Sequence, residues 1–155
     1  MMYLRKMVVT IGLCRAFGTM GFCCECSEGW NAEAAFRESA LVFRGRIDES
    51  FFSRAREWYG LMRMRVSLCT FTVDELFKGD DLRSVHVYDG IGGEGAGACA
   101  YPFKGGVDYL IYAYRDADGR LWTHICTGTK PVRDAEEIAN LRRWKRDASR
   151  PKTGR

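Results

Sequence analysis

The chain has 155 residues, of which 46% are hydrophobic and 13% aromatic, so it has room for one domain with an ordinary core, and a disordered protein is excluded. Its formal net charge is +4, but residues 141–155 contribute +6, which leaves −2 for the rest of the chain. A slightly acidic body argues against a nucleic-acid partner, and we expect the basic end to be a solvated helix face that leads into a disordered tail at residues 147–155.

Seven cysteines are typical of a chain of this length that folds in an oxidising compartment, where disulfides persist. Arg5 and Lys6 before a short apolar run resemble the start of a signal peptide. We therefore expect residues 1–23 to be a removed leader and the mature protein to be secreted or periplasmic. A lipoprotein cut before Cys23 is disfavoured because Phe22 precedes it. No later stretch has the ~18 continuous apolar residues of a membrane span.

Two cysteines follow the leader as Cys24-Glu25-Cys26, and single cysteines stand far downstream at Cys99 and Cys126. Side chains alternate along an extended segment, so the cysteines of a C-x-C pair point toward different partners and do not readily close on each other. We expect Cys99 and Cys126 to be those partners. Two disulfides would then tie the start of the mature chain to the strands that follow.

The next part of the chain is predicted to be a short helix followed by two strands. Trp30–Ser39 contains helix formers, and Ala40–Ile47 is rich in β-branched and aromatic residues, with Gly45 indicating a bulge or a close backbone approach. Asp48–Tyr59 is charged and aromatic without a clear period, which predicts a loop. Leu61–Leu76 alternates over its whole length, which predicts a long, half-buried strand.

The alternation assigns two faces to this second strand. The predicted apolar face consists of Met62, Met64, Val66, Leu68 and Thr70. Cys69 falls on the opposite, more polar face beside Ser67, so we do not expect it to pair with the C-x-C cysteines. A buried free thiol is favoured over an exposed thiol that links two copies of the chain.

Three more strands are predicted at Ser84–Tyr88, Val107–Tyr114 and Leu121–Cys126, the last two joined by a hairpin turn at Asp118-Gly119. Residues 90–97 are glycine-rich but lack the G-x-x-x-x-G-K-[ST] pattern of a phosphate loop, and no helix pattern follows them. We expect a flexible connection there.

Asp134–Arg146 is predicted to be the C-terminal helix, with Asp134 as its cap and Glu137 completing a capping box. The predicted buried stripe runs through Ala135, Ile138, Leu141 or Arg142, and Trp144 or Lys145. Five strands with a short N-terminal and a C-terminal helix predict a mainly β protein. A five-stranded Greek-key barrel of the OB-fold plan, stapled by disulfides, fits this count best.

The order of motifs resembles the netrin-like module, and most closely the N-terminal domain of the tissue inhibitors of metalloproteinases. The motifs are C-E-C at 24–26, V-F-R-G-R-I at 42–47, V-D-E-L-F-K-G-D at 73–80, C-A-Y-P-F-K-G-G-V-D-Y-L-I-Y-A at 99–113 and T-H-I-C at 123–126. This resemblance implies an OB-like domain at residues 24–146. It also implies the disulfides Cys24–Cys99 and Cys26–Cys126.

The resemblance further implies a secreted, monomeric inhibitor whose partner is a zinc metalloproteinase. The mature N-terminal Cys24 would chelate the protease's zinc through its α-amino nitrogen and carbonyl oxygen, and Glu25 would enter the specificity pocket. Cys26, Ala98 and Cys99 would contact the protease beside it. Glu25 stands where the family usually has a small residue. A netrin-like protein-binding module without inhibitory activity is the alternative.

Other chemistries lack the residues that they need. His86 and His124 fall in predicted strands, and no orienting Asp or Asn is placed for a nucleophilic cysteine. Cys23 and Cys26 have C-x-x-C spacing, but the second close pair of a structural zinc site and the βαβ setting of a redox site are both absent from the sequence pattern. We expect no enzyme activity, no cofactor and no metal of the chain's own.

Overall fold

The computed structural model describes residue 26 and residues 29–59, 62–90 and 99–150, with the backbone alone at 48–59 and 62–66. The predicted leader, Cys24, Glu25 and Ala98 lie outside these ranges. The elements in chain order are α1 (Ala32–Glu38), β1 (Leu41–Tyr59), β2 (Met62–Lys78), β3 (Ser84–Asp89), β4 (Asp108–Arg115), β5 (Leu121–Thr123), β6 (Lys130–Pro131) and α2 (Ala135–Ala148).

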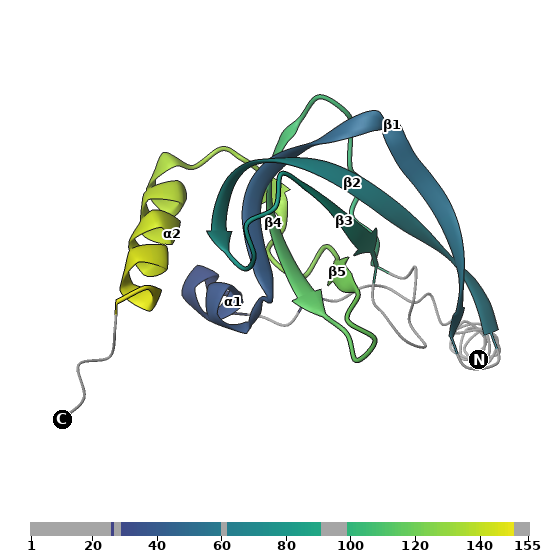
Figure 1. Ribbon diagram of the computed structural model, residues 1–155, viewed down its shortest axis with the longest axis horizontal. Coiled ribbons are helices and arrows are strands. Elements are labelled where there is room, and N and C mark those ends of the chain that lie inside the picture. The colour runs from purple at the N-terminus through teal and green to yellow at the C-terminus, as the bar shows by residue number, and fades with distance from the viewer. Residues whose placement is uncertain (1–25, 27–28, 60–61, 91–98, 151–155) are drawn as a thin grey trace, which may run out of the picture.

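Five strands form a closed mixed barrel in the order β1-β2-β3-β5-β4, and β1 pairs with β4 to close it. The β3–β5 pairing is parallel and the others are antiparallel. The two-residue strand β6 pairs with the beginning of β4, on the edge opposite to β1. Figure 1 shows α1 and α2 together at one side, while the long ribbon of β1 and β2 extends to the other. The mainly β barrel with a helix before it and a helix after it, as the sequence predicts, is confirmed.

Two apolar clusters hold this arrangement together. The inside of the barrel is filled by side chains that include Phe43, Phe71, Val87 and Ile111. The second cluster lies between the helices and the outer face of β1 and β4, and it consists of Phe36, Val42, Phe77, Leu110, Tyr112, Ile138 and Leu141. Buried side chains therefore lie on both faces of β4 and of the first part of β1, residues 41–47, which explains why these stretches are largely apolar rather than alternating.

Gly45 lies where β1 bends between two partner strands. A Cβ atom there would lie 2.4 Å from the carbonyl oxygen of Thr72, and the register of β1 against β2 shifts between Arg44 and Gly45. Both features that the sequence predicted at Gly45, a close approach and a bulge, are present. The bulge lets β1 pair with β2 and with β4 along the same residues.

Two predictions about β1 and β2 are wrong. Asp48–Tyr59 is not a loop, because β1 continues to Tyr59 and pairs with β2 beyond a register shift that interrupts the period. The faces of β2 are also reversed where its side chains are described: Cys69 is fully buried and Leu68 only half-buried. Alternation separates two faces but does not say which one points inward. In this protein the pairing with β3 sets the inward face of β2, because Cys69 pairs with Val87 and both are buried.

The C-terminal half needs two further corrections. β5 ends at Thr123 instead of Cys126, and residues 125–128 form a turn. Asp134 caps α2 as predicted, accepting the N–H of Glu136 at 2.9 Å. The capping box is wrong, because the Glu137 carboxylate is buried against other elements. In the predicted stripe Ile138 and Leu141 are buried, whereas Ala135 is exposed.

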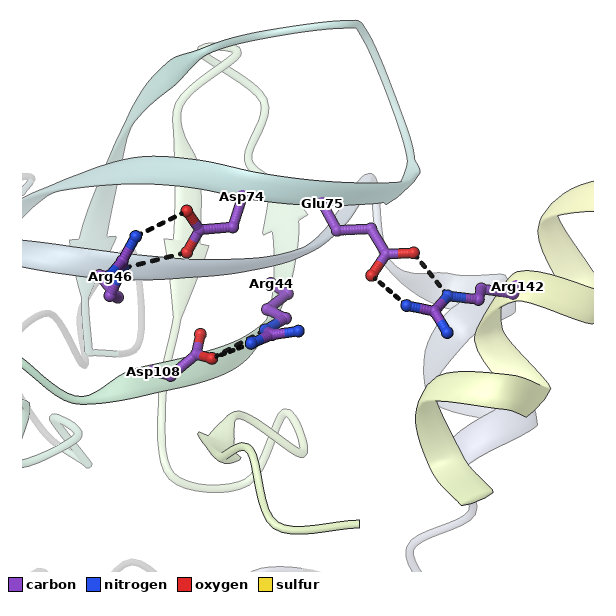
Figure 2. A network of polar contacts seen from close by, with 6 residues as sticks. All are labelled: Arg44, Arg46, Asp74, Glu75, Asp108 and Arg142. Atoms are coloured by element: carbon purple, nitrogen blue, oxygen red, sulfur yellow. Dashed lines mark hydrogen bonds and ion pairs between the residues drawn. The ribbon is translucent and has the colours of Figure 1, made fainter. Parts of the chain in front are cut away.

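Three arginine–carboxylate pairs tie the outer edges of the elements together (Figure 2). The pairs are Arg44–Asp108, Arg46–Asp74 and Arg142–Glu75. In the last pair, Nε and Nη2 of Arg142 donate to the two carboxylate oxygens of Glu75 at 2.7 and 2.9 Å, which docks α2 on β2 and holds the pKa of Glu75 below its usual value. These partly exposed pairs fix orientation and add little stability.

Candidate functional site

A disulfide joins Cys26 to Cys126, with a Cα–Cα distance of 5.2 Å and a sequence separation of 100 residues. The pairing that the resemblance implied for Cys26 is therefore present. It fixes the beginning of the described chain on the turn that follows β5. Cys26 is exposed and Cys126 is half-buried, so the bridge lies at the surface of the barrel.

The turn that carries Cys126 is shaped by His124. The N–H of Cys126 donates to Nδ1 of the imidazole at 3.1 Å, and the N–H and hydroxyl of Thr127 both donate to the His124 carbonyl oxygen. An accepting Nδ1 requires the neutral tautomer with its proton on Nε2. Burial lowers the pKa of His124, which favours the same neutral form. The role of His124 in the structure is thus to hold the turn.

Cys99 lies beside this turn, because its carbonyl oxygen accepts the N–H of Ile125 at 3.1 Å. It has a φ of 58°, unusual for a residue with a side chain, and it is disulfide-bonded. The predicted Cys24–Cys99 pair has its other half outside the described residues. The structure therefore brings together two of the predicted disulfide positions, Cys99 and Cys126, on adjacent segments.

A buried carboxyl group binds the backbone two residues after Cys99. Asp89 is 2% exposed, and its Oδ1 accepts the N–H of Tyr101 at 2.7 Å. Burial raises the pKa of Asp89 to about 7, and the Tyr101 N–H acts in the opposite direction. Cys69 is free and fully buried, and burial together with the nearby Asp89 raises the pKa of its thiol to about 12. Cys69 is therefore a core thiol and not a nucleophile.

Trp30 provides a second attachment of the N-terminal segment that the sequence analysis missed. Its ring lies against the backbone of Gly128, where a Cβ would come within 2.4 Å of it. Nζ of Lys130 lies 4.5 Å from the centre of the ring, and the Tyr112 ring packs nearly perpendicular to it with 6.1 Å between the ring centres. The sequence feature that could have predicted this contact was Gly128, two residues beyond Cys126. A glycine there permits both a turn and the close approach of another side chain.

A pocket of about 590 Å³ opens beside the disulfide, between α1 and the turn after β5. Its lining includes Cys26, Trp30, Tyr114, His124, Ile125 and Lys130. Trp30 is 44% exposed and Ile125 is 37% exposed, which makes them two of the exposed large apolar side chains in the part of the chain that the structure describes. The size is within the range of sites that receive a small molecule or a side chain of a partner, about 300–1,000 Å³.

The described residues contain no group of three or more His, Cys, Asp or Glu side chains that could hold a metal ion. His86 bonds to Thr70 on the outside of the sheet at 2.8 Å, whereas His124 lies in the turn. None of the helices in the described ranges is long and apolar enough to cross a membrane.

No protein-family model matches the chain, and no curated protein matches it either.

Proposed function

We propose that the chain is a netrin-like protein with an OB-fold barrel that inhibits a zinc metalloproteinase from its mature N-terminus. The OB-fold part is supported by the five-stranded closed barrel and by the order of its strands, since the OB-fold is a small Greek-key barrel of five strands. The short helix before the barrel and the longer helix after it match the plan expected from the resemblance.

The observation that carries the proposal is the position of Cys26 and Cys99 on neighbouring segments. Cys26 is bound to Cys126, and Ile125, the residue before Cys126, donates its N–H to the carbonyl oxygen of Cys99. A chain that continues from Cys26 toward its N-terminus therefore starts next to Cys99. This is the geometry that a C-x-C motif needs in order to reach both partners.

The chemistry follows from a free amine at residue 24. An α-amino group with a pKa near ~8 loses its proton readily beside a dication, and with the adjacent carbonyl oxygen it forms a five-membered chelate. That chelate displaces the zinc-bound water that attacks the substrate, so hydrolysis stops. Anchoring through Cys26 reduces the ordering entropy that the terminus loses when it enters the cleft.

Secretion and a protein partner belong to the same proposal. A disulfide is consistent with an oxidising compartment, and the leader would expose residue 24 only once it is removed. The protein then acts by binding, with no cofactor and no metal of its own, and as a monomer. Glu25 would require a target with a cationic group in its specificity pocket, because a carboxylate in an apolar pocket is strongly unfavourable.

The decisive experiment compares two refolded proteins against a panel of zinc metalloproteinases, one beginning at Cys24 and one with an additional alanine ahead of it. We expect inhibition by the first, and a loss of about 100-fold or more, or about 2.8 kcal/mol, in the second. Equal inhibition by both forms would exclude chelation by the amine. No inhibition by either form at micromolar protein would reject the inhibitor.

The second candidate is a netrin-like binding module without inhibitory activity. It is favoured by the pocket of about 590 Å³ flanked by exposed Trp30 and Ile125, because exposed apolar side chains beside a cavity are typical of a protein-binding surface. Absence of inhibition by both N-terminal forms would leave this candidate in place.

A further inference from the structure

The part of β1 and β2 farthest from the helices, which we call the outer ribbon, consists of residues 53–59 and 62–66. Among the described residues, the pairing of β4 with β1 ends at Arg46, and the pairing of β3 with β2 begins at Ser67. The residues of the outer ribbon therefore pair only with the other strand of the ribbon. Figure 1 shows this ribbon extending away from α1 and α2. Two strands without a third are marginally stable in water, so a partner surface would stabilise them.

The register divides the residues of the outer ribbon between two faces. Residues directly opposite each other share a face, and successive residues of one strand alternate between the faces. Arg56 is opposite Arg65, and Glu57 falls on the other face opposite Met64. The first of these, which we call the arginine face, includes Arg54, Arg56, Trp58, Arg63 and Arg65.

The charge of the outer ribbon is concentrated on this face. Its residues have four arginines and one glutamate, a net charge of +3, and the glutamate belongs to the opposite face. Like charges directly opposite each other, as at Arg56 and Arg65, destabilise a strand pair. No carboxylate of the outer ribbon shares the arginine face, so an anionic partner would supply the missing negative charge.

The end of the outer ribbon is apolar or aromatic on both faces. Trp58 belongs to the arginine face, while Tyr59 pairs with Met62 on the other face, to which Met64 also belongs. Tryptophan and tyrosine are enriched at the level of lipid head groups, and basic residues near a bilayer are attracted by anionic lipids. DNA or a sulfated polysaccharide would neutralise the arginines but offers the methionines no apolar layer. This combination therefore favours a lipid surface over a soluble polyanion.

We propose that the outer ribbon docks on a bilayer with anionic head groups. The arginine face binds lipid phosphates, and the aromatic and methionine residues at the end of the ribbon enter the interfacial layer. The protein lies on such a membrane and does not span it. This docking goes beyond the inhibition of a protease and does not depend on it, because the N-terminal segment takes no part.

The test is co-sedimentation of the disulfide-bonded protein with vesicles of phosphatidylcholine alone, or with about one third phosphatidylglycerol to make them anionic. The charge variant is Arg56→Gln/Arg65→Gln, and Arg56→Lys/Arg65→Lys keeps the charge. The matched control is Arg143→Gln/Arg146→Gln, which removes the same charge from exposed positions on α2.

A second pair of variants examines the end of the ribbon. Trp58→Ser removes its largest aromatic residue, and Leu82→Ser removes an apolar side chain that is 39% exposed in the connection between β2 and β3. Far-UV circular dichroism, together with mass spectrometry of the Cys26–Cys126 bridge, verifies the fold of every variant.

We expect the protein to bind the anionic vesicles and to bind those of phosphatidylcholine alone much more weakly. Neutralising two arginines should weaken binding about 30-fold, since each contributes about fivefold near an anionic surface. The lysine variant should retain most of the binding. Trp58→Ser should weaken binding about tenfold, because part of the ring area returns to water. The two controls should change binding by less than about twofold, since distant charges are screened by salt.

Equal binding to both kinds of vesicle, or binding to neither, would reject the membrane surface. A loss in the α2 control as large as in Arg56→Gln/Arg65→Gln would replace the arginine face by a general effect of net charge. If the protein ignores vesicles but binds DNA or a sulfated polysaccharide, and Trp58→Ser leaves that binding unchanged, the arginine face belongs to a soluble polyanion. A protein that inhibits no protease would leave each of these measurements equally decisive.

Discussion

Asp89 accepts the backbone N–H of Tyr101 at 2.7 Å and is 2% exposed. Asp89 is the last residue of β3 and Tyr101 lies within the connection that leads to β4, so a buried carboxyl group attaches this connection to the end of β3. The Asp89 carboxyl group is protonated in the folded protein up to a pH of about 7, so the strength of this attachment depends on pH.

The contribution of Asp89 to the free energy of unfolding should fall as the pH rises through the acidic range. Because the pKa of Asp89 is raised from 3.8 to about 7 on folding, its contribution is complete below pH 4 and is lost between pH 4 and 7. The free energy of unfolding lost over this range is about 4 kcal/mol, at ~1.4 kcal/mol per pH unit. Asp89→Asn keeps an acceptor for Tyr101 and should be more stable than the wild type at pH 8 and similar at pH 4. Urea unfolding at a series of pH values measures this.

Asp118→Asn serves as the matched control, because Asp118 lies on the exposed turn between β4 and β5 with 70% of its side chain accessible. Its pH profile should run parallel to that of the wild type. A parallel profile for Asp89→Asn as well would show that Asp89 does not titrate with the raised pKa.

Loss of the Cys26–Cys126 bridge should cost about 4–5 kcal/mol of unfolding free energy, on the chain-entropy treatment of a disulfide that closes a separation of 100 residues. The double variant Cys26→Ser/Cys126→Ser removes it without leaving a reactive thiol. Guanidinium unfolding under non-reducing conditions gives the difference. A loss below about 1 kcal/mol would mean that the bridge itself contributes little to the stability of the fold.

The sequence reveals local features of the fold well and the contacts between distant elements poorly. Gly45 and the Asp134 cap were predicted because a bulge and a helix start depend on neighbouring residues. Glu137 has the spacing of a capping box, yet its carboxylate meets Tyr112 of β4 and Lys130 of β6. No local pattern could indicate partners brought together by the closing of the barrel.

The same limit applies to the site. Cys26 and Cys126 could be paired from a resemblance of motifs, because cysteines have few possible partners. Trp30 was predicted only as part of a helix, since an isolated aromatic residue is compatible with many environments. Its seat on Gly128 depends on a turn 98 residues away in the chain.

Glu137 should contribute strongly to stability because its carboxylate satisfies a buried hydroxyl and pairs with Lys130. Glu137→Ala is expected to cost about 2–4 kcal/mol, since it leaves the Tyr112 hydroxyl unpaired and opens a cavity. Tyr112→Phe alone should cost about 1 kcal/mol. In a double-mutant cycle the two changes should be non-additive, with a coupling of at least about 0.5 kcal/mol. Additive losses would contradict the hydrogen bond.

Gly128→Ala and Gly119→Ala form a matched pair that isolates the contribution of Trp30. Both glycines have positive φ, +92° and +83°, so both variants incur the same backbone strain of about 1 kcal/mol. A Cβ at Gly119 meets nothing within 4 Å, whereas one at Gly128 meets the Trp30 ring. We therefore expect Gly128→Ala to be more destabilising by a further 1–3 kcal/mol or so, as in overpacked sites.

The excess should disappear when the ring is removed first. In a Trp30→Ala background, Gly128→Ala should cost no more than Gly119→Ala, because only the strain of the turn remains. Thermal and urea unfolding of the six proteins, namely the two backgrounds each with and without either substitution, measures both differences. An equal cost of the two glycine substitutions in the Trp30 background would mean that the indole ring does not rest on Gly128. The attachment of Trp30 would then be absent, and the disulfide and the packing of Phe36 in α1 would hold the N-terminal segment.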